Sequence, residues 1–451
     1  MSQLMKSISG IRGVVGDGLD PEQCARFAAA FGNYCEGGTV VLGRDTRPTG
    51  EMVRQAVIAG LMATGCTIVD VGVVPTPTVA IMVEELGADG GICITASHNP
   101  IQWNALKFFH RDGLFLDPAQ AARHLELAEK GPSYADWSRM GSLSLREDAL
   151  EIHVNRILAL DLLDVPALRK RNFRVALDCV NGAGSAMLPH LLQELGCDVV
   201  KIGCDGSGRF FREAEPTPEN ITELSRVVAE GGFDLGFAVD PDADRLALVD
   251  AKGVPLGEEQ TLALCARFVL AHRKGPVAVN VSSSAIMDDV CAEAGVPLHR
   301  TRVGEINVSI EMRKSGAVIG GEGNGGVILP DLHLGRDAPV GLALVLQYML
   351  ENGIGLRALR EELPTYQMVK EKVELGTLDG EAAVNALRER FADRPMDETD
   401  GLKFLQPDGR SWVQVRRSNT EPILRIFAEA PTREAASALV NELRAALPTG
   451  A

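Results

Sequence analysis

Apolar and polar residues follow the same order in three separate parts of the chain. Each part has a short run rich in β-branched residues, then a small or polar turn, then a helical repeat, and the runs begin at Thr39, Val175 and Val277. Strands that alternate with helices in this way predict mixed or parallel sheets flanked by helices on both faces. In such folds ligands gather beyond the carboxyl ends of the strands. We therefore expect an α/β protein whose functional side chains follow its strands.

The last part of the chain has a different pattern. Apolar and polar residues alternate over residues 368–375, a further strand leads into Arg416, and Ala435, Leu439 and Leu443 recur at a spacing of four. Alternation is typical of a half-buried strand, and a spacing of four is typical of an amphipathic helix. This part is therefore predicted to be a smaller α+β unit.

The length of the chain predicts several domains. Its 451 residues exceed what one core holds, at roughly 100 to 200 residues per domain. Breaks in the pattern fall near residues 150–155, at the turn over 253–257 and near Pro364. We accordingly predict four domains, which comprise residues 1–152, 153–253, 254–364 and 365–451.

Charge and composition narrow the class of protein. The formal net charge of −16 disfavours nonspecific binding to nucleic acid or to an anionic membrane. No apolar run approaches the roughly 20 residues that a membrane helix needs, and residues 1–6 lack a signal-peptide pattern. The nine cysteines show no CxxC pair or metal-ligand spacing, which indicates reduced thiols. We expect a cytoplasmic protein with no nucleic-acid or membrane partner.

One serine stands in a polar turn directly after an apolar run. Ser97 lies within residues 95–100, Thr-Ala-Ser-His-Asn-Pro, which follow the run that ends at Ile94. Ser97 is therefore a candidate nucleophile at a strand exit. A serine in a turn more often bonds nearby backbone groups, so this interpretation depends on the other motifs of the chain.

Three alternating aspartates follow another apolar run. Asp240, Asp242 and Asp244 come after the strand that ends at Val239, and Arg245 closes the motif. An extended backbone would send all three carboxylates to one side, where their charges repel unless a cation binds. Mg²⁺ fits such a site because it takes oxygen ligands and leaves positions for water or a phosphate oxygen. The alternative interpretation is a solvated acidic turn.

Two glycine-rich or polar loops complete the set of motifs. Residues 321–326, Gly-Glu-Gly-Asn-Gly-Gly, let a backbone approach a ligand closely, and residues 416–422, Arg-Arg-Ser-Asn-Thr-Glu-Pro, suit a phosphate. In this order the four motifs resemble those of the α-D-phosphohexomutase family, which moves a phosphoryl group between O1 and O6 of a hexose. The resemblance implies three related α/β domains with mixed sheets and a smaller C-terminal α+β domain around a central cleft.

The resemblance also implies a mechanism. Ser97 would carry a phosphate and complete the Mg²⁺ site with the three aspartates. The phosphoserine would give its phosphoryl group to a sugar monophosphate, and the resulting hexose 1,6-bisphosphate would turn around and return the other phosphate. For the proton transfers, Lys107 matches the family's lysine after the serine loop and Arg12 its amino-terminal arginine. His98 is interpreted as a residue that shapes the loop.

Substrate contacts are carried over residue by residue. The phosphate loop implies contacts to the remote phosphate, and the sugar loop, which reads Glu-x-Ser-Gly-His in many members, implies contacts to the hydroxyls. The predicted substrate-binding residues are Arg245, Arg302, Glu322, Asn324, Arg416, Ser418, Asn419, Thr420 and Arg425.

The chain departs from the family's pattern at three positions. Asn324 replaces a serine, Gly326 replaces a histidine, and Arg417 stands where a proline or small residue is usual. His333 is a candidate substitute for the missing histidine.

The sequence leaves the exact substrate open. Asn324 favours glucosamine phosphate, because a Glu-x-Asn-Gly loop is similar to that of the amino-sugar members, and mannose or glucose phosphate is the second choice. A phosphomonoesterase and a catalytically silent sugar-phosphate-binding protein are the alternatives from other classes. The predicted partner is a small sugar phosphate, and both a monomer and a dimer remain open.

Overall fold

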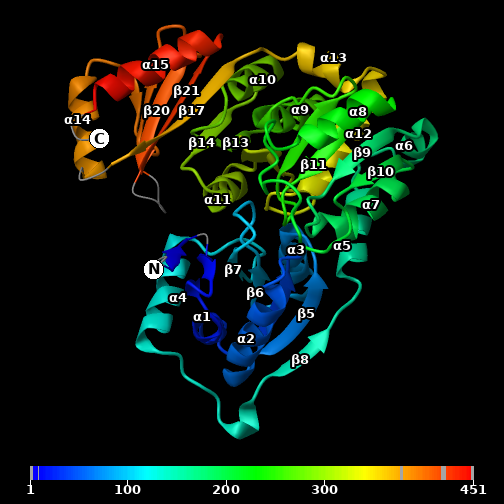
Figure 1. Ribbon diagram of the computed structural model, residues 1–451, viewed down its shortest axis with the longest axis vertical. Coiled ribbons are helices and arrows are strands. Elements are labelled where there is room, and N and C mark those ends of the chain that lie inside the picture. Colours follow the sequence, from blue (N-terminus) through cyan, green and yellow to red (C-terminus); the bar gives the residue numbers. More distant parts are fainter. Residues whose placement is uncertain (1–3, 9, 376–378, 418–422, 448–451) are drawn as a thin grey trace.

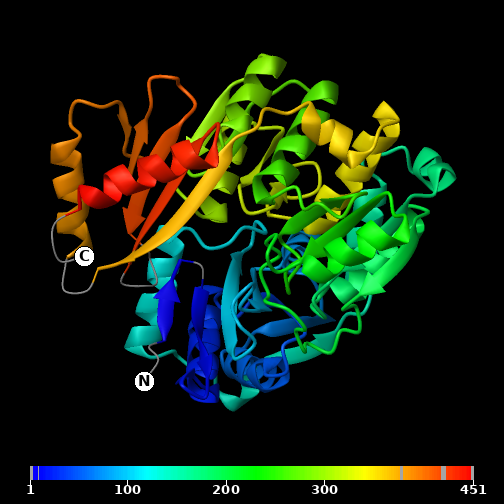
Figure 2. The ribbon, with the colours of Figure 1, turned by 45° about the horizontal axis from the view of Figure 1, so that its top comes forward.

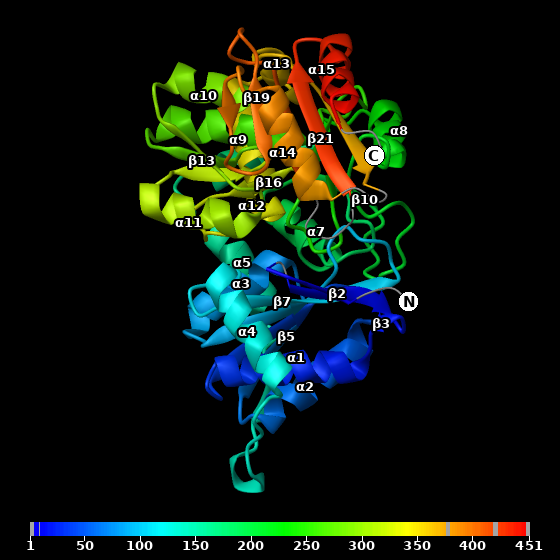
Figure 3. The same ribbon diagram turned by 90° about the vertical axis from the view of Figure 1, so that its left-hand side faces the viewer.

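The structure is a computed structural model that describes residues 4–8, 10–375, 379–417 and 423–447 (Figure 1). These residues form four units, each built on its own sheet. The first unit lies at the bottom of the view and the other three lie above it, a separation that Figure 3 shows from the side. Among the described residues, no helix has the length and apolar character to cross a membrane.

The first three units share one arrangement of four strands. In each unit the first strand lies between the second and third, which run parallel to it, and the fourth pairs antiparallel with the third. In the first unit these strands are β4 (Thr39–Arg44), β5 (Thr67–Val73), β6 (Gly90–Ile94) and β7 (Trp103–His110). In the second unit they are β9 (Arg174–Asp178), β10 (Asp198–Ile202), β11 (Leu235–Val239) and β12 (Leu246–Asp250). In the third unit they are β13 (Val277–Asn280), β14 (Leu298–Thr301), β15 (Ile319–Glu322) and β16 (Gly326–Ile328). The predicted mixed sheets are therefore confirmed.

The first sheet is extended to eight strands at its two edges. The added strands are β1 (Met5–Ser7), β2 (Gly10–Val15) and β3 (Gly18–Leu19) on the side of β7, and β8 (Ser142–Leu145) beside β5. The helices of this unit are α1 (Pro21–Tyr34), α2 (Gly50–Ala63), α3 (Thr76–Leu86) and α4 (Pro118–Lys130), with a short 3₁₀ helix, η1 (Trp137–Arg139).

The second and third units share one continuous hydrophobic core. Their helices are α5 (Ala149–Leu158), α6 (Val165–Arg171), α7 (Gly184–Glu194) and α8 (Thr222–Gly231), then α9 (Glu258–His272), α10 (Ile286–Ala294), α11 (Glu305–Ser315), α12 (Ala338–Asn352) and α13 (Leu356–Glu361). Helix α12 is buried from Ala338 to Met349, because it packs between α9 and the helices α5 and α6. Its apolar sequence therefore reflects a core position.

The fourth unit is an antiparallel sheet with helices, as predicted for a smaller α+β domain. Its strands are β17 (Gln367–Glu374), β18 (Met396–Asp397), β19 (Leu402–Leu405), β20 (Trp412–Arg417) and β21 (Ile423–Ala430), and its helices are α14 (Gly380–Arg390) and α15 (Arg433–Ala445). Figure 2 shows α15 lying across the sheet, where it packs against β17, β20 and β21. Its own core is separate from those of the other units.

Candidate active site

Three of the predicted motifs occupy equivalent positions in the three related units. The Ser97 loop joins β6 to β7, the aspartate loop joins β11 to β12, and the Glu322 loop joins β15 to β16. Each loop thus follows the third strand of its unit at the carboxyl end, where ligands gather in α/β folds. The loops meet at a cavity of about 930 Å³, to which the fourth unit contributes residues of β17, β20 and β21.

Most of the predicted site residues line this cavity. The described residues among them that do so are Arg12, Ser97, His98, Lys107, Arg245, Glu322, Asn324, Arg416 and Arg425. Arg302 is not part of the lining; its side chain is exposed and its Nε donates to the carbonyl of Thr399, 3.1 Å away. Ser418, Asn419 and Thr420 lie outside the described residues.

Ser97 is held in an unusual backbone conformation. Its φ of 48° lies in the left-handed region, which non-glycine residues adopt at a cost and which concentrates at functional sites. Its amide donates to Thr95 Oγ1 at 2.9 Å, and its own Oγ donates to Asp240 Oδ2 at 2.8 Å. Ser97 is only 3% exposed, yet it borders the cavity. The loop therefore aims Ser97 Oγ at the aspartate cluster.

A buried arginine that sequence reasoning missed holds this loop. Arg47 donates to the carbonyl oxygens of Ser97 (2.6 Å), Asn99 (2.7 Å), Pro100 (2.7 Å) and Trp103 (3.0 Å). Its side chain is fully buried. The guanidinium thus satisfies four loop carbonyls at once, which its planar set of donors allows.

Asp45 pairs with this arginine and extends the support. Its carboxylate accepts from Arg47 Nε at 3.1 Å and from Thr95 Oγ1 at 2.6 Å. Burial raises the pKa of Asp45, and the charge of Arg47 opposes that shift. Asp45 and Arg47 come just after the end of β4 at Arg44, so the expectation that functional side chains follow strands could have predicted them.

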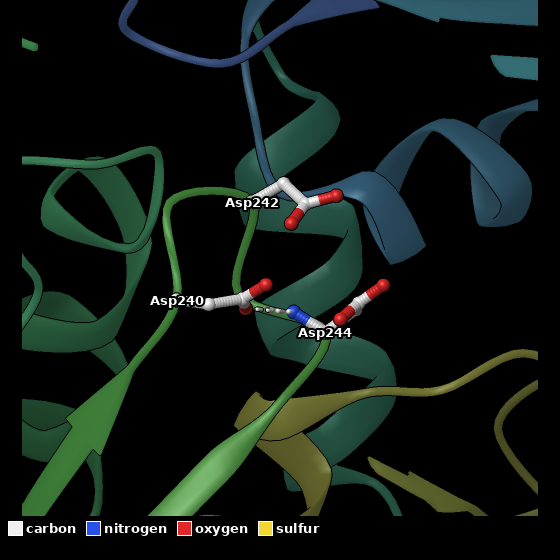
Figure 4. Close-up of side chains that lie close together, drawn as sticks. All are labelled: Asp240, Asp242 and Asp244. Atoms are coloured by element: carbon white, nitrogen blue, oxygen red, sulfur yellow. Dashed lines mark hydrogen bonds between the residues drawn. The ribbon is translucent and has the colours of Figure 1, made fainter. Parts of the chain in front are cut away.

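Asp240, Asp242 and Asp244 converge on one point (Figure 4). They are buried, and one oxygen of each lies within 4.8 Å of the others. The convergence comes from a turn, in which Ala243 takes a φ of 52°, and not from the extended backbone that we expected. Among the residues that the structure describes, Asp242 Oδ1 and Asp244 Oδ1 have no hydrogen-bond partner. Buried carboxylates with free oxygens are suited to a hard divalent cation.

Among the described contacts, Lys107 is the positively charged side chain nearest to the three aspartates. Its Nζ lies 2.6 Å from Asp242 Oδ2 and 3.7 Å from Asp244 Oδ2. Burial acts to lower the pKa of Lys107, but the two carboxylates outweigh it and the pKa is raised. Burial and the neighbouring charges of Asp242 and Asp244 raise the pKa of Asp240 well above its usual range. Arg336 Nη2 also lies 2.7 Å from Asp244 Oδ2, and the crowding of three carboxylates favours a further cation beside these two.

A further arginine and an imidazole lie at the Ser97 loop. Arg12 Nη1 donates to Asn99 Oδ1 at 2.5 Å, and burial lowers the pKa of Arg12. His98 Nδ1 lies 3.3 Å from Ser97 Oγ. Burial and the charges of Arg245 and Arg12 lower the pKa of His98 well below its usual range and so oppose protonation of the ring. This matches a role in shaping the loop better than one as a proton donor.

The Glu322 loop is built for hydrogen bonding. Glu322 accepts from Asn280 Nδ2 at 2.9 Å and from the amide of Gly304 at 3.0 Å, and Arg336 Nη1 bonds its other oxygen at 3.0 Å. Burial opposes ionisation of Glu322, but the Arg336 charge and these donors hold its pKa below its ordinary value. Asn324 Oδ1 accepts from the amide of Gly326. Fixed carboxylate and amide groups at a cavity wall are suited to sugar hydroxyls.

The fourth unit places two arginines at the cavity. Arg416 on β20 and Arg425 on β21 are opposite each other in the strand pair. Arg416 is mostly buried, which lowers its pKa. Two arginines side by side repel each other unless an anion lies between or beside them, and guanidinium groups bind phosphate by paired hydrogen bonds.

His333, the candidate substitute for the missing histidine, lies just before α12. Its Nε2 lies 3.0 Å from Asp337 Oδ2, and the same oxygen lies 2.8 Å from His153 Nε2. All three side chains are buried at the start of α12, away from the cavity lining. The imidazole of His333 therefore contacts the cap of α12, the structural role that a lone histidine more often has, and it does not line the cavity.

Known proteins match the whole length of this chain. Models of the phosphoglucomutase/phosphomannomutase domains match residues 4–134 (alpha/beta/alpha domain I), 151–253 (domain II), 258–366 (domain III) and 369–446 (C-terminal domain). A probable phosphoglucosamine mutase of Methanopyrus kandleri is 41% identical over 441 residues, which cover 96% of this chain and 95% of that protein. A phosphoglucomutase/phosphomannomutase of Thermococcus kodakarensis is 38% identical over 437 residues, which cover 95% and 94%.

A solved structure agrees with these matches. The crystal structure of a phosphoglucomutase/phosphomannomutase family protein from Burkholderia thailandensis superposes with a TM-score of 0.85 at 25% identity and covers 98% of this chain and 97% of that chain. Fold and relatives together define a phosphohexomutase, an isomerase that transfers a phosphoryl group intramolecularly. The chain belongs to the phosphoglucomutase/phosphomannomutase family. The predicted family, four-domain fold and enzyme class are confirmed.

Proposed function

We propose that this enzyme interconverts hexose 6-phosphates and hexose 1-phosphates through a phosphorylated Ser97 and a hexose 1,6-bisphosphate. The observation that carries the proposal is the contact of 2.8 Å between Ser97 Oγ and Asp240 within a buried cluster of three carboxylates. Asp240, Asp242, Asp244 and the phosphate on Ser97 would hold one Mg²⁺. When bound, the cation would offset the charge of the phosphate and polarise the bond that breaks.

The side chains of this chain would handle the charge and the proton. The bond between phosphorus and Ser97 Oγ breaks as a bond from phosphorus to O1 or O6 of the sugar forms. The proton that the sugar hydroxyl loses balances the one that Ser97 Oγ gains. Lys107, whose Nζ lies 2.6 Å from Asp242 Oδ2, would act as the base or acid for this proton with Arg12 assisting, while Arg416 and Arg425 would bind the remote phosphate.

The preferred sugar is proposed to be glucosamine phosphate. Asn324 stands in the sugar loop where many relatives have serine, and the Methanopyrus relative is named a probable phosphoglucosamine mutase. The Thermococcus relative is named a phosphoglucomutase/phosphomannomutase, so glucose and mannose phosphates are the second choice. The proposed setting is the cytoplasm, where the small sugar phosphate would be the partner.

Rates with matched substrates test the proposal. We expect kcat/KM for glucosamine 6-phosphate to exceed those for glucose and mannose 6-phosphate, measured with Mg²⁺ and a hexose 1,6-bisphosphate activator. A much slower reaction with glucosamine 6-phosphate would assign the enzyme to the second choice. Release of free phosphate in step with loss of substrate would identify a phosphomonoesterase and reject the mutase. A Ser97→Ala variant at full speed would remove Ser97 from the mechanism.

A further inference from the structure

Arg336 lies between the sugar loop and the metal loop. It precedes α12, and its side chain is 9% exposed. Its guanidinium contacts three carboxylates from separate segments: Nη2 lies 2.7 Å from Asp244 Oδ2, Nε lies 2.9 Å from Glu305 Oε2, and Nη1 lies 3.0 Å from Glu322 Oε2. One side chain therefore connects the second unit with two parts of the third.

These contacts require the shape of a guanidinium as well as its charge. Its N–H donors point outward in one plane, so three acceptors in three directions can each receive a direct bond. A lysine ammonium could neutralise part of the charge but could not keep all three carboxylates apart at fixed positions. Because Glu322 is buried and the Glu305 side chain is only 12% exposed, loss of the arginine would leave these two carboxylates without the cation that they contact, whereas Asp244 would keep Lys107 at 3.7 Å.

The stem of Arg336 also fills the space beside Gly326. A Cβ atom at position 326 would lie 2.2 Å from Arg336 Cδ and 2.9 Å from its Cγ. The φ of Gly326 is not in the left-handed region, so its backbone would accept a side chain. Arg336 is thus the main obstacle at the position where many phosphohexomutases have a histidine.

We propose that Arg336 is a positioning residue for the mutase reaction, which fixes Glu322 of the sugar loop relative to Asp244 of the metal loop. The inference rests on the proposed function, because it assigns Glu322 to the sugar and Asp244 to the cation. The side chain enters the cavity wall from the segment before α12 and not from the sugar loop itself.

A double-mutant cycle tests this link. We expect Arg336→Met to lower kcat/KM about 10- to 100-fold, as loss of outer-shell partners does, and Gly326→Ala to lower it because Arg336 must move. Gly326→Ala combined with Arg336→Ala, which removes the Cγ and Cδ atoms beside position 326, should be little slower than Arg336→Ala alone, because the remaining tight contact of the new Cβ is with Asn324 Oδ1 at 3.1 Å. Effects that multiply would overturn the proposal. Arg357→Met, on the exposed face of α13, is the matched control and should behave as the wild type.

Two further measurements separate positioning from folding. Calorimetric binding of glucosamine 6-phosphate in EDTA should weaken in Arg336→Met, and Gly326→His combined with Arg336→Ser should be faster than Gly326→His alone. Unchanged binding, or no gain in the combined variant, would refute the inference. Activity of the wild-type enzyme separates failure of the proposed function from failure of the role given to Arg336. If the wild type isomerises no hexose phosphate, the proposed function fails. If it does and Arg336→Met equals it, only the role of Arg336 fails.

Discussion

Buried charge dominates the site at the scale of single residues. Asp240, Asp242 and Asp244 face one another with Lys107 beside them, and below the serine loop Arg47 neutralises Asp45. Buried ions must be paired, because each loses its hydration in the protein. Removing one partner of a structural ion pair should therefore lower stability, whereas removing one carboxylate of a cation site should weaken cation binding.

The pair of Arg47 and Asp45 is a structural one. Arg47→Met should lower the free energy of unfolding by about 3–5 kcal/mol, because it leaves Asp45 and four loop carbonyls without their donor. Urea unfolding would measure the change, and Arg146→Met, on an exposed pair, is the control with an effect below about 0.5 kcal/mol. A variant within about 1 kcal/mol of the wild type would contradict the assigned role.

The aspartate cluster should respond to the cation. Asp242→Asn removes a charged ligand, so it should weaken Mg²⁺ affinity by more than the roughly 10- to 100-fold seen for outer-shell changes. The mutase rate should fall with it. Titration of the rate with Mg²⁺ and calorimetry with Mn²⁺ would measure both, with the exposed Asp136→Asn as control. Unchanged magnesium dependence would remove Asp242 from the cation site.

At the scale of elements, one strand order repeated three times places three loops at one cavity. The loops after β6, β11 and β15 carry Ser97, the aspartates and Glu322 because each follows the third strand of its unit. The predicted boundaries after residues 152, 253 and 364 remain a prediction. Helix α12 links the units, since its N-cap Asp337 accepts from Val340 N and from two histidines.

The cap of α12 has a testable pH dependence. Burial opposes ionisation of Asp337, but His153 and His333 hold its pKa below the ordinary 3.8. A depressed folded pKa means that the stabilisation is complete above the ordinary value and is lost as pH falls through the folded value. Asp337→Ala should lower the free energy of unfolding at pH 7 by at least about 2 kcal/mol. Urea unfolding should show a smaller loss of stability on acidification than in the wild type; an equal loss would contradict the assignment.

At the scale of the whole molecule, the fourth unit closes the cavity and is fastened to the third. Glu429 on β21 accepts from Ser284 Oγ at 2.5 Å and from the amide of Ala285 at 2.7 Å, while Trp412 Nε1 donates to it at 2.9 Å. The same strands carry Arg416 and Arg425. The position of the phosphate-binding arginines therefore depends on this contact.

Glu429→Gln should loosen that contact by about 1.5–3 kcal/mol, the range for hydrogen bonds to a charged group. The expected results are a higher KM for sugar phosphates and faster proteolysis near residues 364–368. Steady-state kinetics and limited proteolysis would measure them, and Glu434→Gln on exposed α15 is the control. A variant with unaltered KM and cleavage would show that the fourth unit is held by other contacts.

The sequence alone determined the strand exits, the order of the motifs and the division into α/β and α+β parts. These are local properties, because the alternation of apolar and polar residues, the turn residues and the spacing of carboxylates can all be recognised within a few residues of Ser97 or Asp240. Only the tertiary structure decided that Arg47 holds the serine loop, that a turn brings the aspartates together, that Arg302 lies off the cavity, and that Arg336 and not His333 occupies the space beside Gly326. The reason is physical: the positions of Arg47, Arg302 and Arg336 depend on contacts between segments far apart in the chain, and the aspartate turn depends on a left-handed φ at Ala243 that no local pattern predicts.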